Sequence, residues 1–398
     1  MLRWLQGSVP VQRIYFDHNA TTPVHPAVAD AMTAVLREDF GNPSSVHHFG
    51  QRAKAAIDQA RSAVGALIGA DPSEVVFMSG GTESDNLAIR GAAEALERTG
   101  RRHLIATAIE HEAVLNTVKA LARRGWTTTL LPVDATGIVS VEALREALTD
   151  ETAVVSVMHA NNEIGTIQPI VELARLAHER GALFHTDAVQ SAGKIPVDVR
   201  TLGADLLSVS AHKFYGPKGV GALWIRRGLR LAAVLTGGKQ ERSRRAGTEN
   251  VAGIVGMGIA AGAARLKMAD EATCLSALRD RLEEGILRAV PGTLINGARA
   301  SRVPNTTNIS FDRVEAESLL IALDLEGVAV STGSACSSGT LEPSHVLKAM
   351  GFSPHRAQNS LRFSLGAANT EAEVDRVVSI MPGIVEKLRS LTRTPVRA

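Results

Sequence analysis

Two ionisable side chains follow apolar runs in the middle of the chain, and their types suit one cofactor. Lys213 lies in the stretch 205–223 (DLLSVSAHKFYGPKGVGAL), just after an apolar run, and Asp187 follows the apolar run 182–185. Both runs read as buried strands. Pyridoxal phosphate (PLP) needs a lysine amine for its attachment and an acid beside its pyridinium nitrogen, which lets the ring accept carbanion electrons. Such a pair is common, and most lysines are solvated surface residues. The pair predicts PLP binding only if the chain also supplies a site for the phosphate of the cofactor.

A candidate phosphate site precedes them in the sequence. The apolar run 75–78 (VVFM) leads into Ser79-Gly80-Gly81-Thr82 and then into a helix-like segment. Free backbone N–H groups and the helix dipole favour an anion at such a helix start. The segment has neither a GxGxxG fingerprint nor a P-loop, so nucleotide binding is not supported. An ordinary capped helix is the alternative, and the paired glycines favour phosphate.

Strand-like and helix-like segments alternate from residue 75 to residue 185, which predicts a mainly parallel sheet covered by helices. In such sheets ligands bind outside the carboxyl ends of the strands. Six chemically apt residues follow strand ends: Thr82, His111, Asn162, Asp187, Gln190 and Lys213.

The pattern changes after Ala246. A small-residue helix is predicted from Gly247 to about Met268, and a second helix from Ala272 to Ala289. A mixed α+β tail follows. We therefore expect a large domain over 14–264 and a smaller one over 265–398, with the N-terminal segment packing on the smaller one.

Composition excludes several classes of protein. The chain has 398 residues, 45% of them hydrophobic, with 43 basic and 41 acidic side chains. Neither nucleic-acid binding nor membrane insertion is expected, and the short basic cluster 239–245 (KQERSRR) is interpreted as a solvated loop. Two cysteines, Cys274 and Cys336, suit a reducing cytoplasm and provide no cysteine-rich metal site. The opening 13 residues lack the apolar core of a secretory signal.

Several motifs, taken together and in this order, resemble the cysteine desulfurase family, in the branch that serves iron–sulfur cluster assembly and nitrogenase maturation. The resemblance extends from about Ile14 to the end of the chain. Its motifs are SGGTESDNLAI, EHEAV, MHANNEIGTIQPI, HTDAVQSAGK, SAHKFYGPKGVGAL, RAGTEN, STGSACSSG and LRFSLG. It implies fold type I of the PLP-dependent transferases: α/β, with a mainly parallel seven-stranded sheet in the large domain and a smaller α+β domain.

The resemblance also implies a role for each matching residue. Lys213 would carry PLP, Asp187 would pair with the ring nitrogen, Gln190 with the ring hydroxyl, and His111 would stack on the ring and move protons. Gly81, Thr82, Ser210 and His212 would bind the phosphate, together with Thr248 from the second subunit of a homodimer. Asn162 and Arg362 would hold the substrate carboxylate. Cys336 would accept the sulfur, and could transiently ligate a cluster iron; no other metal is implied.

The residue types agree with these roles. A guanidinium such as that of Arg362 matches a carboxylate in two parallel hydrogen bonds, although a strand-edge surface charge is the alternative. His111 could instead be a satisfied core histidine. Cys336 lies among small polar residues that build no core, so we expect a mobile loop there. Cys274 is expected to be structural, and the adjacent His47 and His48 to lie in a loop near a binding cleft.

The implied reaction converts L-cysteine to L-alanine. Lys213 takes the Cα proton, the thiolate of Cys336 attacks the substrate sulfur, and the persulfide passes its sulfur to an acceptor protein. An iron–sulfur scaffold, a tRNA-thiolation protein and a molybdenum-cofactor carrier are all possible acceptors. A selenocysteine lyase or a class V aminotransferase is the rival enzyme, and an inactive partner-binding scaffold is the rival of another class.

Overall fold

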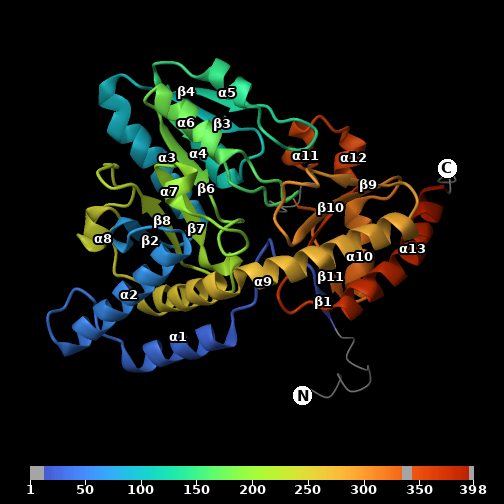
Figure 1. The fold of residues 1–398 in the computed structure, drawn as a ribbon, viewed down its shortest axis with the longest axis horizontal. Helices are drawn as coiled ribbons and strands as arrows, with labels where there is room; N and C mark the ends of the chain where they lie inside the picture. Colours follow the sequence, from blue (N-terminus) through green and yellow to red (C-terminus); the bar gives the residue numbers. More distant parts are fainter. Residues whose placement is uncertain (1–12, 334–342, 394–398) are drawn as a thin grey trace, which may run out of the picture.

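The structure is a computed structural model that describes residues 13–333 and 343–393. Its central sheet has seven strands (Figure 1). Their order is β2 (Val75–Met78), β8 (Gly221–Ile225), β7 (Leu206–Ser210), β6 (Leu183–Asp187), β5 (Thr152–Ser156), β3 (His103–Thr107) and β4 (Thr127–Leu131). Strand β8 runs antiparallel to both neighbours, and the other pairs are parallel. The predicted mainly parallel sheet is confirmed.

The central strands are buried on both faces, which explains their continuous apolar runs. Along β2, Val75 and Phe77 join one hydrophobic cluster, whereas Val76 and Met78 join another, because successive side chains point to opposite faces. Helices α3 (Gly81–Leu96) and α4 (Glu112–Ala122) cover the second face. The first face is covered by α1 (Pro26–Glu38), α2 (His48–Leu67), α5 (Val141–Ala147), α6 (Ile170–Glu179), α7 (Val199–Leu202) and the start of α9 (Val251–Ala289).

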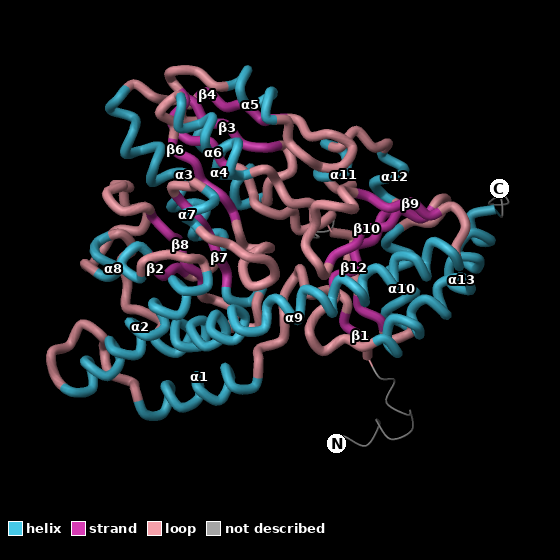
Figure 2. Tube along the Cα trace, in the orientation of Figure 1, coloured by secondary structure: helices cyan, strands magenta, loops and turns pink. Residues whose placement is uncertain are grey.

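A second packing unit has its own small sheets, separated from the first in Figure 2. Strands β9 (Thr293–Asn296), β10 (Thr306–Phe311) and β12 (Ser360–Ser364) are antiparallel, and β1 (Ile14–Tyr15) pairs in parallel with β11 (Val328–Ala329). Ile14 and Phe16 belong to the hydrophobic cluster of this unit, so the N-terminal segment packs here. The helices of this part of the chain are α10 (Ala316–Leu325), α11 (His345–Ala349), α12 (Pro354–Gln358) and α13 (Glu371–Arg393).

Helix α9 joins the two units. The prediction of two helices is wrong here, because α9 is continuous over 39 residues. Its exposed middle, Ala269-Asp270, contains neither glycine nor proline, so nothing breaks the helix. The expected domain boundary at 264/265 lies inside α9, and the division into two domains stays a prediction.

The first part of α9 is apolar because it packs inside the protein. One 18-residue window of α9 is long and apolar enough to cross a membrane, and half of that window is buried in the protein. Helix α2 lies so close that a Cβ at Gly258 would lie 2.5 Å from the Cα of Ala60. The window therefore has the character of a core helix, for which small residues permit close approach.

Candidate active site

A cavity of ≈ 380 Å³ lies at the carboxyl ends of the central strands and has walls from both packing units. It brings together ten residues that the sequence had singled out: Gly81, Thr82, His111, Asn162, Asp187, Gln190, Ser210, His212, Lys213 and Arg362. Other residues of its wall were not singled out: Asn19, Ala20, Asp85, Glu112, Met158, Glu163, Val189, Ser331, Gly333 and His345. The expectation that the strand-end residues lie close together is met, while their individual roles stay predictions.

Lys213 lies in a short 3-10 turn, Ala211–Lys213, directly after β7. Its Nζ donates hydrogen bonds to the backbone oxygens of Asn19 (2.6 Å) and Ala20 (2.8 Å). Burial, and then the positive charge of Arg362, lower the pKa of this amine to about 8, although nearby carboxylates oppose the shift. A larger fraction of Lys213 is therefore neutral near pH 7 than of an ordinary lysine.

Asp187 ends β6 and lies among other buried carboxyl groups. One of its oxygens accepts from the N–H of Val189 (2.8 Å). Burial raises the pKa of Asp187. Burial also raises the pKa of Glu110 to about 8. Burial also raises the pKa of Asp85, and the neighbouring Asp187 raises it further. A buried carboxylate is stable only beside a positive partner, so the protonated ring nitrogen of PLP would fit against Asp187.

The corner formed by α3 and the end of β7 suits an anion. Helix α3 starts at Gly81, and its N-cap Gly80 makes no side-chain capping bond. The Oγ of Ser210 is buried without a hydrogen-bond partner among the described residues. A Cβ at position 81 would lie 2.9 Å from Val189, so a glycine keeps this approach open. An orphaned hydroxyl beside free helix N–H groups fits the phosphate of PLP.

His212, His111 and Gln190 already have partners in the protein. Burial, and then nearby lysines, lower the pKa of His212 to about 4, so its ring is neutral, and its Nδ1 lies 3.2 Å from the hydroxyl of Thr21. His111 caps α4 by accepting at Nδ1 from the N–H of Ala113 (3.1 Å), so the neutral ring carries its proton on Nε2. Gln190 donates to the backbone oxygen of Asn19 (2.9 Å).

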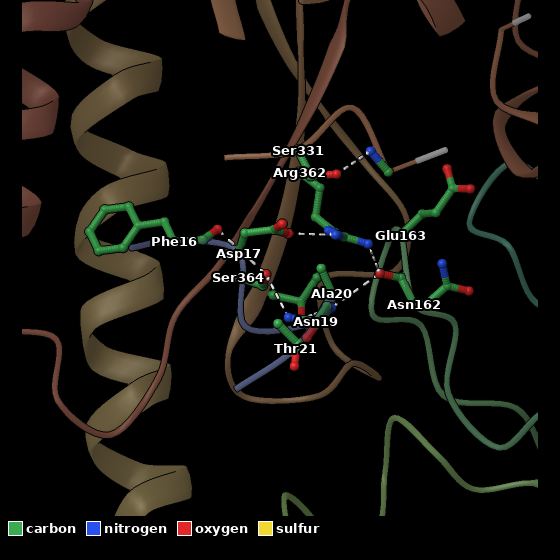
Figure 3. A network of polar contacts seen from close by, with 12 residues as sticks. Phe16, Asp17, Asn19, Ala20, Thr21, Asn162, Glu163, Ser331, Arg362 and Ser364 are labelled. Atoms are coloured by element: carbon green, nitrogen blue, oxygen red, sulfur yellow. Dashed lines mark hydrogen bonds and ion pairs between the residues drawn. The ribbon is translucent and has the colours of Figure 1, made fainter. Parts of the chain in front are cut away.

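Arg362 reaches the cavity from β12 of the second unit. One terminal nitrogen donates to the backbone oxygen of Asn162 (2.9 Å), and the other forms an ion pair with Asp17 (2.6 Å), as Figure 3 shows. Its Nε is buried without a partner among the described residues. The arginine that the resemblance assigns to the substrate carboxylate thus lies in the cavity and retains donor capacity, although sequence reasoning missed its partner Asp17.

Asn19 lines the cavity and connects the two packing units. The sequence analysis did not single out this residue. Its side chain donates to Thr306 (2.8 Å) and to the backbone oxygen of Asn162 (3.1 Å), and accepts from Lys194 (2.9 Å). Its backbone oxygen accepts from Lys213. The only available signal was a polar turn, 17–22 (DHNATT), after a short apolar run.

Two of the predicted site residues, Thr248 and Cys336, are not among the described residues that line the cavity. Thr248 is exposed and lines a separate hollow with Gly247 and Asn250. Its role depends on a second subunit and stays a prediction. Cys336 lies outside the described residues, so its role and the expected mobility of its loop also stay predictions. Ser331 and Gly333, which precede that segment, line the cavity.

Three minor expectations need correction. The 239–245 cluster is not simply a solvated loop, because Glu241 is buried and pairs with both terminal nitrogens of Arg61 (2.7 and 2.8 Å). Cys274 is exposed on α9, so it has no core-packing role. His47 caps α2 by accepting from Gly50, and neither it nor His48 is among the residues that line the described cavity.

Comparisons with known proteins agree with the fold. A model of the aminotransferase class-V family matches residues 14–377. The cysteine desulfurase IscS of Dictyoglomus turgidum is 50% identical over 381 residues, which cover 96% of either chain. The solved structure of a NifS-like protein has a TM-score of 0.89 and 39% identity, and covers 94% of this chain and 100% of its own.

A third relative was solved with a ligand. The structure described as SspA in complex with cysteine has a TM-score of 0.78 and 36% identity, and covers 88% of this chain and 98% of its own. The predicted resemblance and fold type are thereby confirmed. The chain belongs to the class-V aminotransferase family of PLP-dependent enzymes and, within it, to the cysteine desulfurases.

Proposed function

We propose that this protein converts L-cysteine to L-alanine, holds the released sulfur as a persulfide on Cys336, and supplies it for iron–sulfur cluster assembly. One observation carries the proposal: a single cavity contains the amine of Lys213, the buried carboxyl of Asp187 and the guanidinium of Arg362. An amino-acid substrate needs a cation for its carboxylate, and a PLP enzyme needs the amine and the acid.

PLP would be held by Lys213, by Asp187 at its ring nitrogen, by Gln190 at its ring hydroxyl, and at its phosphate by Gly81, Thr82, Ser210 and His212. When bound, PLP supplies an electron sink for the carbanion that forms at the substrate Cα. Thr248 would complete the phosphate site from the partner in a homodimer, which agrees with its exposure in the single chain.

Lys213 moves the proton. Its depressed pKa, about 8, leaves neutral amine available to remove the Cα proton of the substrate. Arg362 and Asn162 hold the substrate carboxylate, which fixes the Cα–H bond relative to Lys213. His111 lies at the cavity wall, where it would stack on the cofactor ring and exchange protons with the substrate thiol.

Cys336 takes the sulfur. Its thiolate attacks the substrate sulfur, the new S–S bond forms as the Cβ–S bond breaks, and the released electron pair is protonated at Cβ to give L-alanine. The persulfide then passes to an acceptor protein, for which an iron–sulfur scaffold is the first candidate. The two cysteines of the chain suit a reducing cytoplasm.

The test is to mix the purified protein with L-cysteine and a thiol reductant, and to measure L-alanine and sulfide together. Equal amounts of both products, with a visible absorbance band from bound PLP, are expected. A transaminase would yield a keto acid instead, and an inactive scaffold would show no band. Preference for selenocysteine is measured in the same assay.

A further inference from the structure

The buried Arg362 pairs with the half-buried Asp17, and neighbouring backbone holds the pair in place. The side chains are 20% and 4% exposed, respectively, and the charged atoms lie 2.6 Å apart. Asp17 lies in a bridge with Ser364, two residues from Arg362. Hydrogen bonds from His18 to Ser364 (3.0 Å) and from Ser364 to Phe16 (2.8 Å) flank this bridge. The carboxylate of Asp17 is therefore held in place beside Arg362, which lines the cavity (Figure 3).

Both cations of the cavity face the same short segment. Arg362 meets the side chain of Asp17, and Lys213 meets the backbone oxygens of Asn19 and Ala20. Asn19 is tied down by Thr306, so this segment keeps its place. The internal carboxylate thus neutralises the charge that would attract a carboxylate ligand, although Arg362 still lines the cavity.

A second carboxylate on Arg362 must share the guanidinium with Asp17. Like charges repel strongly where water is largely excluded, so Asp17 weakens the binding of any such ligand. Substrate and product carry the same carboxylate, and strong binding of both would slow release without lowering the barrier. The carboxylate of Asp17 beside Arg362 weakens the binding of both ligands, and so counteracts slow product release.

We propose, on the basis of the function proposed above, that Asp17 is an internal competitor for Arg362: it limits the affinity of the cavity for the α-carboxylate of substrate and product, and so favours product release. The alternative is that Asp17 only orients the guanidinium. The two roles predict opposite effects of Asp17→Asn, which keeps an acceptor oxygen and removes the charge.

The experiment uses propionate, which has the carboxylate of L-alanine but no amine to react with PLP. Its dissociation constant is measured by NMR titration of the PLP-loaded protein. We expect Asp17→Asn to bind propionate about tenfold more tightly than the wild type, and Arg362→Gln to lose binding. Asp375→Asn is the matched control, because it removes the carboxylate of an exposed arginine pair (Arg281–Asp375, 2.7 Å) and should leave the constant unchanged.

Asp17→Ser, which also removes the charge, covers the case in which the asparagine variant does not fold, and should shift the constant in the same direction. The inhibition constant of L-alanine should fall with that of propionate. Unchanged or weaker propionate binding in the charge-removing variants would overturn the proposal, and so would a failure of the wild type and of both variants to bind propionate. A wild type that binds propionate through Arg362 but forms no L-alanine would overturn the function and leave the role of Asp17 standing.

Discussion

The two walls of the cavity come from regions that differ in how their polar groups are placed. On the central sheet, Asp187 ends β6 and Lys213 lies in the short turn after β7, so local sequence fixes their position. On the second unit, Arg362 lies within β12 and depends on Asp17, which is 345 positions away. The first wall holds the groups assigned to proton and electron movement, and the second holds Arg362, the cation assigned to the substrate carboxylate. Chemistry and recognition should therefore be separable by mutation.

The largest effect is expected at the first wall. Lys213→Ala should lower the turnover of L-cysteine by about a thousandfold or more, because it removes both the attachment point and the base. Borohydride reduction followed by mass spectrometry should find no PLP–peptide adduct in the variant. An adduct that persists would assign the cofactor to another lysine.

Cys336→Ser should also stop sulfide release, with a loss of about a hundredfold or more, because a hydroxyl is a far weaker nucleophile than a thiolate. The variant should still bind PLP and should still change its absorbance when L-cysteine is added. Cys274→Ser is the matched control, because that thiol is exposed on α9 and should be dispensable. Normal desulfuration by Cys336→Ser would favour direct elimination, as in a lyase.

At the second wall, Arg362→Gln should reduce kcat/KM for L-cysteine by about a hundredfold, since a charge-assisted bidentate contact is lost. The PLP absorbance band should remain, which separates recognition from chemistry. Arg281→Gln, at an exposed ion pair, is the control and should keep normal kinetics. Loss of PLP together with substrate affinity would show that the two walls are not independent.

The junction between the walls is tested by Asn19→Ala. This side chain is 1% exposed and bonds to Lys194, Thr306 and the backbone of Asn162, so its removal should cost about 2–3 kcal/mol of unfolding free energy. Denaturant unfolding measures the change. Gln51→Ala, at an exposed site, should change stability by less than about 0.5 kcal/mol. A comparable loss in both variants would contradict the role of Asn19 as a junction.

The smallest effect concerns pH. Because the pKa of Lys213 is lowered to about 8, the rate at which the cofactor-free protein recaptures PLP should rise with pH and level off above about 8, whereas an ordinary lysine would level off near its usual value of about 10.4. The unfolded chain binds this proton more tightly, so Lys213 also makes stability rise from about pH 8 to about pH 10.4. A recapture rate that still rises well above pH 9 would contradict the depressed pKa.

The sequence by itself determined the central sheet and the wall built on it. Apolar runs that alternate with amphipathic segments predict parallel strands, and residues directly after those strands must meet at one edge, which placed Thr82, Asp187 and Lys213 in one cavity. Family motifs added Arg362.

Only the tertiary structure decided what surrounds these groups. The Asp17–Arg362 pair, the bonds of Asn19, and the burial that lowers the pKa of Lys213 depend on contacts between segments hundreds of residues apart. The continuity of α9 was likewise decided by packing at both of its ends, where α2 and α13 cover it. The local sequence pattern indicates helix and strand propensity and the periodicity of apolar residues. Charge pairing and desolvation depend instead on which distant segments pack against each other.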